Sequence, residues 1–102
     1  MIIRLIRNEN DRPSYLVEAL YDLKRLAVAS DESAEWIGEA VASLNLGERD
    51  AEHVWLSATV LEEHGPPDPQ WHRNFKSMID YAARNGWVSE VGWVRAHIIP
   101  PT

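Results

Sequence analysis

The spacing of hydrophobic residues changes along this chain, and the changes divide it into predicted strands and helices. Residues 2–7, IIRLIR, are rich in Ile with two interspersed Arg, which is typical of a short strand. From residue 86 onward Val, Trp and Ile dominate, which indicates a β-hairpin. Most of the chain between these two parts places apolar residues three or four positions apart, a spacing that predicts helices.

Four helices are predicted in this central part: residues 14–30, 30–47, 49–65 and 69–86. In the first of them, Leu16, Leu20 and Leu23 recur at helical spacing and form an apolar stripe. Asp68 followed by Pro69 is the strongest helix start in the chain. It places a capping carboxylate before a proline at the first helical position.

The repeated Gly-Trp-Val of residues 86–94, GWVSEVGWV, sets the expected register of the hairpin. A three-residue loop, 90–92, places Gly92 in the left-handed conformation of a bulge and puts Val94 opposite Val88. A two-residue loop would instead shift the register and separate the two Trp. With the three-residue loop, strand alternation gives one face four side chains: Trp87, Trp93, Arg95 and His97.

Two interpretations of this face remain open. In the first, helices pack on it, because Trp side chains are usually mostly buried. In the second, it is a patch that binds a partner. Trp and Arg are enriched at interface hot spots, and a cation beside Trp adds a cation–π contact.

The expected fold is α+β, with an N-terminal strand, a four-helix body and a C-terminal β-hairpin. A lone hairpin is only marginally stable, so we expect the first strand to pair with it in a small antiparallel sheet. The helices would pack on one face of this sheet. The order of elements is also similar to a winged-helix arrangement, in which residues 71–86 would be the recognition helix and the hairpin the wing.

Composition places few restrictions on the class of protein. The 102 residues are 45% hydrophobic, which fits one globular domain over residues 1–102. The absence of Cys excludes disulfides, thiolate metal sites and Cys nucleophiles. No apolar run approaches the roughly 20 residues of a membrane span, and the N-terminus lacks a secretory pattern. We therefore expect a soluble cytoplasmic protein that does not contact membranes.

The net charge of −6 is concentrated in the middle of the chain. Residues 14–64 hold three Lys or Arg against eleven Asp or Glu, whereas both ends are nearly neutral. Such an acidic surface repels nucleic acid and attracts a basic partner, although acidic helix faces also simply keep a small protein in solution. We place Lys24 and Arg25 in the last turns of the first helix, where the helix dipole favours cations.

Candidate catalytic chemistry is sparse. Glu63, His64 and His72 lie on either side of a proline-rich loop and are of ligand types that suit zinc. They are weak candidates, because no motif with metal-ligand spacing contains them, and we predict no metal and no cofactor. No nucleophile elbow and no glycine-rich phosphate loop is present, so nothing in the sequence assigns a catalytic residue.

These observations favour a small acidic binding or regulatory protein that acts through protein–protein contact, rather than an enzyme. The predicted partner-binding residues are Trp87, Trp93, Arg95 and His97. One alternative is a small metal-dependent enzyme, or an accessory subunit of one, that uses His64 and His72. Another is a winged-helix nucleic-acid binder, which would use Arg73, Lys76, Arg84 and Arg95. Homodimerisation is compatible with all three functions.

Overall fold

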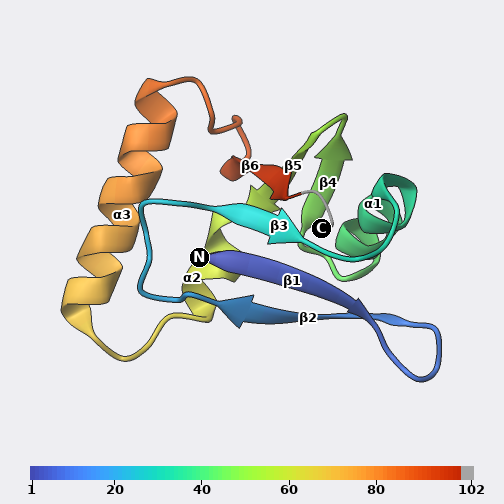
Figure 1. Ribbon diagram of the computed structural model, residues 1–102. Helices are drawn as coiled ribbons and strands as arrows, with labels where there is room; N and C mark the ends of the chain where they lie inside the picture. Colours follow the sequence, from blue (N-terminus) through green and yellow to red (C-terminus); the bar gives the residue numbers. More distant parts are fainter. Residues whose placement is uncertain (100–102) are drawn as a thin grey trace.

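The computed structural model describes residues 1–99, in which six strands form one mixed sheet (Figure 1). The strands are β1 Ile2–Arg7, β2 Pro13–Glu18, β3 Ala27–Ala29, β4 Gly47–Asp50, β5 His53–Ser57 and β6 Trp93–Ile99. The helices are α1 Ala34–Ser43, α2 Ala58–Glu63 and α3 Pro69–Arg84. The strand order is β2-β1-β3-β6-β5-β4; β1, β3 and β6 run parallel, and the remaining neighbours pair antiparallel.

The core lies between one face of the sheet and the helices. Alternate strand residues are buried on that face, and they form one cluster with apolar residues of all three helices: Ile3, Leu5, Val28, Val54, Leu56, Val94 and Ala96 from the strands, and Ile37, Ala40, Val41, Leu61, Trp71, Phe75 and Ala82 from the helices. The radius of gyration is 13.2 Å, which about 100 residues give when they fold as one domain. Along residues 1–99, no helix has both the length and the apolar character that crossing a membrane requires.

Three elements agree with the expectations from sequence. The first strand is β1, and α1 forms within the helix predicted over residues 30–47. Its buried side is Ile37, Ala40 and Val41, and Ser33 caps its start by accepting from the Trp36 amide at 3.1 Å. The α3 helix begins as predicted: Asp68 accepts from the Gln70 amide at 3.0 Å, and Pro69 is the first helical residue. An N-cap side chain bonds to an amide only two or three residues further along the chain, so a helix start of this kind can be predicted from sequence.

The helix predicted over residues 14–30 is wrong, because this segment forms β2, a turn and β3. Tyr15 and Val17 pack against the core, whereas Leu16 between them is 53% exposed, which is the alternation of a strand. Ala19 then adopts a left-handed φ of 50°, which a helix does not contain. The helical spacing of the leucines therefore joined positions from a strand and from a turn.

The helix predicted over residues 49–65 is also wrong, because only its last part is helical. Its first part completes β4 and forms β5, and Val54 and Leu56 alternate as buried residues with partly exposed ones. The two strands are joined by a two-residue turn in which Ala51 has a φ of 55°. Gly or Asn usually occupies that conformation, so the sequence carries no turn signal here.

The overall expectation of a four-helix body with a small antiparallel sheet is likewise wrong. Residues 1–99 contain three helices and a six-stranded mixed sheet, and β1 is separated from β6 by β3. The C-terminal hairpin is reduced to one bridge, Val88 opposite Val94. Within residues 1–99 the hairpin that would form the wing is only this bridge, so the winged-helix alternative is wrong as well. The extra strands were missed because apolar residues in and around them also fit a helical spacing, and because β3 pairs only with strands that are distant in the sequence.

The loop register does follow the expectation. The Ser89 amide donates to the Trp93 carbonyl at 2.8 Å, and the Gly92 amide donates to the Ser89 carbonyl at 3.0 Å. Gly92 has a φ of 82°, in the left-handed region predicted for it. The side chains of Trp93, Arg95 and His97 consequently alternate with the buried Val94 and Ala96 and lie on the sheet face opposite the core.

Candidate functional site

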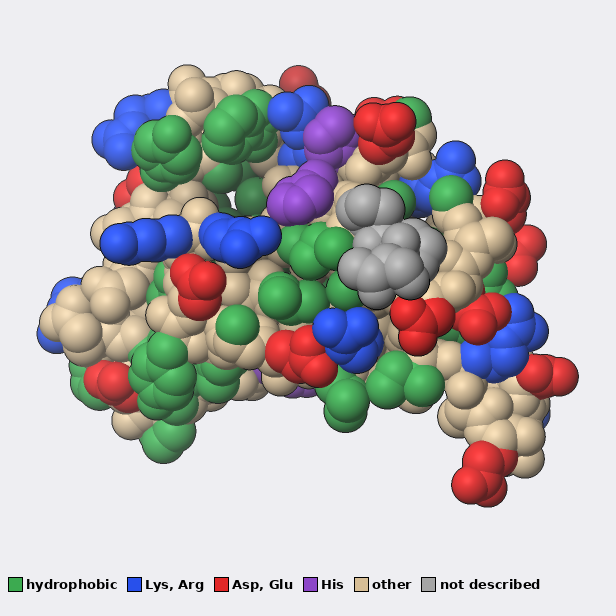
Figure 2. All heavy atoms as spheres, viewed as in Figure 1, with side chains coloured by type: hydrophobic (Ala, Val, Ile, Leu, Met, Phe, Trp, Pro, Cys, Tyr) green, Lys and Arg blue, Asp and Glu red, His purple; other side chains and the backbone are tan. Residues whose placement is uncertain are grey.

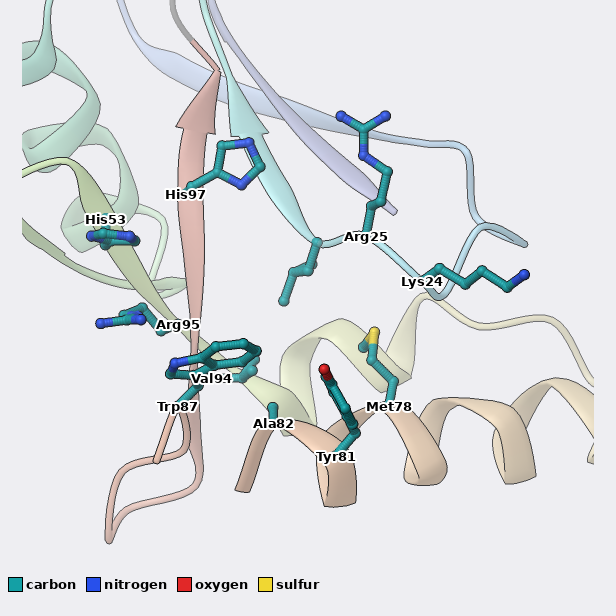
Figure 3. Close-up of a pocket in the computed structure, with 11 residues that line it drawn as sticks. Lys24, Arg25, His53, Met78, Tyr81, Ala82, Trp87, Val94, Arg95 and His97 are labelled. Carbon is teal, nitrogen blue, oxygen red and sulfur yellow. The ribbon is translucent and has the colours of Figure 1, made fainter. Parts of the chain in front are cut away.

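A cavity of about 340 Å³ opens beside the start of the short strand β3. β3 pairs with β6 only at residues 97–99, so the earlier part of β6 has no strand on that side. There the Arg95 amide donates to the Trp87 carbonyl at 2.9 Å, which brings the segment after α3 against β6. We call this cavity the cleft; it is lined by Lys24, Arg25, Leu26, His53, Met78, Tyr81, Ala82, Trp87, Val94, Arg95 and His97 (Figure 3).

One side of the cleft is aromatic and apolar. Tyr81 and Met78 project from α3, and Trp87 follows α3 in the chain (Figure 3). The Tyr81 and Trp87 rings meet edge to face, with centroids 6.1 Å apart and planes at 71°. Trp87 is half-buried against the core, whereas Tyr81 is 55% exposed. This side therefore offers ring faces and edges to a molecule entering from solvent.

The other side of the cleft is lined by basic residues. Lys24 and Arg25 precede β3, His53 begins β5, and Arg95 and His97 lie on β6. Figure 2 shows histidine side chains beside a hollow in the surface, with Lys and Arg side chains along its rim. Among the described residues that line the cleft, none is Asp or Glu, although the chain holds 16 of these residues.

Three hydrogen bonds hold the segment that carries Lys24 and Arg25. The amino group of Met1 donates to the Arg25 carbonyl at 2.7 Å and also to the Asp22 carbonyl, and burial lowers the pKa of this amino group. The indole N–H of Trp71 donates to the Leu20 carbonyl at 2.8 Å. The backbone of this wall of the cleft is thus fixed from both the sheet and α3.

Arg95 differs from the other arginine that lies over a Trp ring. Arg7 lies 5.4 Å from the centroid of Trp36, and it is also ion-paired with Glu32 and Asp11. Arg95 lies 5.7 Å from the centroid of Trp87, and it forms no ion pair within residues 1–99. Two carboxylates therefore neutralise the charge of Arg7. Within residues 1–99, no carboxylate forms an ion pair with Arg95, which lines the cleft.

Acidic residues mark the border of this basic surface. In the register of β4 and β5, Asp50 lies opposite His53 and Glu48 lies opposite Trp55. Asp50 also accepts a hydrogen bond of 3.4 Å from the Trp55 indole. The carboxylates on β4 are therefore one strand beyond the cleft, and they confine its positive charge to β5, β6 and the segment before β3.

Three of the four predicted partner-binding residues line the cleft: Trp87, Arg95 and His97. The fourth, Trp93, lies on the same sheet face opposite Ser57 but outside the cleft. Both Trp93 and Trp87 are half-buried. Their burial is therefore intermediate between the two interpretations considered from sequence, since neither Trp is fully buried in the core or fully exposed.

Sequence reasoning missed the basic residues contributed by other elements, namely Lys24, Arg25 and His53. Recognising the strand alternation of HVWLS at 53–57 would have placed His53 beside β6, because His53 pairs directly with His97. No signal local to residues 24 and 25 indicates the cleft.

The weak metal candidates are held apart by other partners. His64 shares a 2.7 Å hydrogen bond with the Tyr15 hydroxyl. The two ring nitrogens of His72 lie 3.0 Å from a Glu62 carboxylate oxygen and 2.9 Å from the Pro66 carbonyl. Both of these atoms are acceptors, so His72 donates from both nitrogens only as the protonated ring. Within residues 1–99, no three His, Asp or Glu side chains lie close enough together to hold a metal ion, and this applies to Glu63 as well.

Two further cavities contain charges that are largely balanced. One lies between α2 and α3, where His72 is paired with Glu62 and Lys76 with Asp80. It includes Arg73 and Lys76 but not Arg95, so the residues of the nucleic-acid hypothesis do not line one cavity. The other lies at the ends of β1 and β3, where Arg7 is paired with Glu32.

No protein-family model matches the chain, no curated protein matches it, and no solved structure matches it. The function proposed below therefore rests on the residues and geometry of the cleft.

Proposed function

We propose that this chain is a small cytoplasmic binding protein that acts through protein–protein contact, with the cleft as the centre of the contact surface. The observation that carries the proposal is the unbalanced positive charge of the cleft in a chain of net charge −6. Lys24, Arg25, His53, Arg95 and His97 gather around a half-buried Trp87, with no carboxylate among them. A partner that presents an acidic group complements this arrangement.

The composition of the cleft also supports a protein partner. Trp, Tyr and Arg are the residues most enriched among those that carry binding energy at protein interfaces. Here the Arg95 guanidinium lies over the Trp87 ring, and Arg95 is the register partner of Trp55 in β5, so aromatic residues neighbour it on both sides. Trp93 extends the same sheet face and would form the rim of the contact. Rigid aromatic walls lose little conformational entropy when a partner binds.

The proposal predicts that Arg95→Ala strongly reduces capture of the partner. The experiment is a tagged pull-down from lysate of the native organism, treated with nuclease and with EDTA and identified by mass spectrometry. We expect one stoichiometric acidic partner with the wild type and a loss of at least about tenfold with Arg95→Ala, because a charge-assisted hydrogen bond is removed.

The matched control is Arg12→Ala, since Arg12 is an exposed arginine in the β1–β2 turn that lines none of the three cavities. It should capture the partner as the wild type does. Thermal melting of both variants shows whether each is folded. Capture by Arg95→Ala equal to that of the wild type would overturn the proposal, as would a partner that is lost after nuclease treatment.

A further inference from the structure

We propose that the cleft takes an aromatic acid, meaning a flat ring that carries one anionic group at its end. This inference rests on the proposed function, because it names the chemical group by which a partner is anchored. The same chemistry occurs in a C-terminal aromatic residue of a protein and in a free small molecule. The experiment below distinguishes these two sources.

The two sides of the cleft impose this bipolar chemistry. Met78, Tyr81 and Trp87 lie together on the α3 side, whereas Arg25 and His97 lie across the cavity from them (Figure 3). A ligand that fills the cavity therefore meets rings at one end and cations at the other. An anion without a ring would leave the aromatic side of the cleft exposed to water. A ring without an anion would leave the basic side chains without a counter-charge.

The size and floor of the cleft limit the ligand to one such group. The volume of about 340 Å³ is near the lower end of the range for small-molecule pockets, about 300–1,000 Å³. Its floor includes Val94 and Ala82, which are buried and apolar. A single aromatic ring with a short side chain that ends in an acid fits this volume and floor. A folded domain or a nucleic-acid duplex is too large to enter the cleft, and only a group at its surface could do so.

Arg95 links the two sides. Its guanidinium lies over the Trp87 ring at 5.7 Å, so it continues the flat aromatic surface while it carries a positive charge. Guanidinium groups both stack on rings and bind carboxylates through two parallel hydrogen bonds. The ring of the ligand would lie along Trp87 and Tyr81, and its anionic group would lie toward Arg95 and Arg25.

Isothermal titration calorimetry with 3-phenylpropionate as the probe tests the inference. The probe is compared with propionate, which lacks the ring, and with 3-phenylpropanol, which lacks the charge. We expect saturable one-to-one binding of 3-phenylpropionate that is at least about tenfold tighter than that of either comparison compound. Arg25→Gln should weaken binding of the acid and leave binding of the alcohol unchanged, while Arg12→Gln should change neither. Equal affinities for all three compounds, or no saturable binding, would overturn the inference.

The source of the acid is resolved by competition with the captured partner. A short peptide that ends in Phe with a free carboxylate should bind and displace the partner, and the same peptide with an amidated end should do neither. Displacement by 3-phenylpropionate but not by the peptide assigns the site to a free small acid that controls partner binding. A captured partner that no aromatic acid displaces would overturn this inference and leave the proposed function standing. Binding of the acid with no partner captured would instead remove the proposed function.

Discussion

At the scale of single residues, two glycines occupy positions that no other residue fits. A Cβ atom added at Gly47 would lie 1.6 Å from the Trp55 carbonyl oxygen in the neighbouring strand. One added at Gly65 would lie 2.2 Å from the indole ring of the buried Trp71. Gly92 differs, since its φ of 82° is strained for other residues but the space around it is open. Close contact with neighbouring atoms therefore constrains Gly47 and Gly65, whereas at Gly92 backbone conformation is the only constraint.

This difference predicts unequal effects of alanine at the two kinds of position. Gly92→Ala should lower the free energy of unfolding by about 1 kcal/mol, the cost of a left-handed conformation for Ala. Gly47→Ala should lower it by about 3 kcal/mol or more, because the new methyl group pushes β4 away from β5. Urea denaturation of the two variants measures both values. Losses of equal size would contradict the close approach of Gly47 to the backbone of β5.

The residue scale also shows which part of the site was predictable. Trp87, Arg95 and His97 were placed on one face from the sequence alone, because a loop register within nine residues decides it. Lys24 and His53 reach the same cleft from other strands and loops. Their convergence depends on sheet order, which local periodicity does not encode.

At the scale of elements, the connection between α2 and α3 depends on one histidine. His72 in the first turns of α3 reaches Glu62 near the end of α2 and the Pro66 carbonyl in the loop between them. The hydrogen bond to Glu62 is the main cause that raises the pKa of His72, and the Pro66 carbonyl adds to it. The protonated imidazole thus joins both helices and the proline loop.

The raised pKa predicts the direction of a pH effect on stability. A group whose pKa is higher in the folded state stabilises the fold while it is protonated in both states, and this contribution is lost as pH rises through the folded pKa. His72→Gln should therefore lower the melting temperature at pH 5.5 and lower it by less at pH 9. Glu62→Gln should behave in the same way. A larger effect of either substitution at pH 9 than at pH 5.5 would contradict the protonated bridge.

The elements also differ in how well sequence predicts them. The α3 helix was found because Asp68 and Pro69 mark its start and Asn85 caps its end. β2 and β5 lie in segments predicted as helix, because Leu16 and Val54 fit a helical spacing with the apolar residues that follow them. Ala19 and Ala51 adopt positive φ without Gly or Asn to announce a turn. In both places, tertiary pairing in a six-stranded sheet overrides the local preference.

At the scale of the whole molecule, charge is separated between the cleft and the rest of the chain. The chain carries a net charge of −6, yet the residues that line the cleft include three Lys or Arg and two His and no acid. The Arg7–Trp36 pair, whose charge is balanced by Glu32, provides an internal comparison on the same molecule. The central claim is that the partner binds the Arg95–Trp87 pair and does not bind the Arg7–Trp36 pair.

The most direct test of this claim is a two-dimensional ¹⁵N–¹H NMR spectrum of the five Trp indole groups, recorded with and without the captured partner. We predict a large shift of the Trp87 indole signal, with the Trp36 signal unchanged because its arginine is already paired. The buried Trp71, bonded to the Leu20 carbonyl, should also be unchanged. A shift of Trp36 without a shift of Trp87 would contradict the account and move the contact surface away from the cleft.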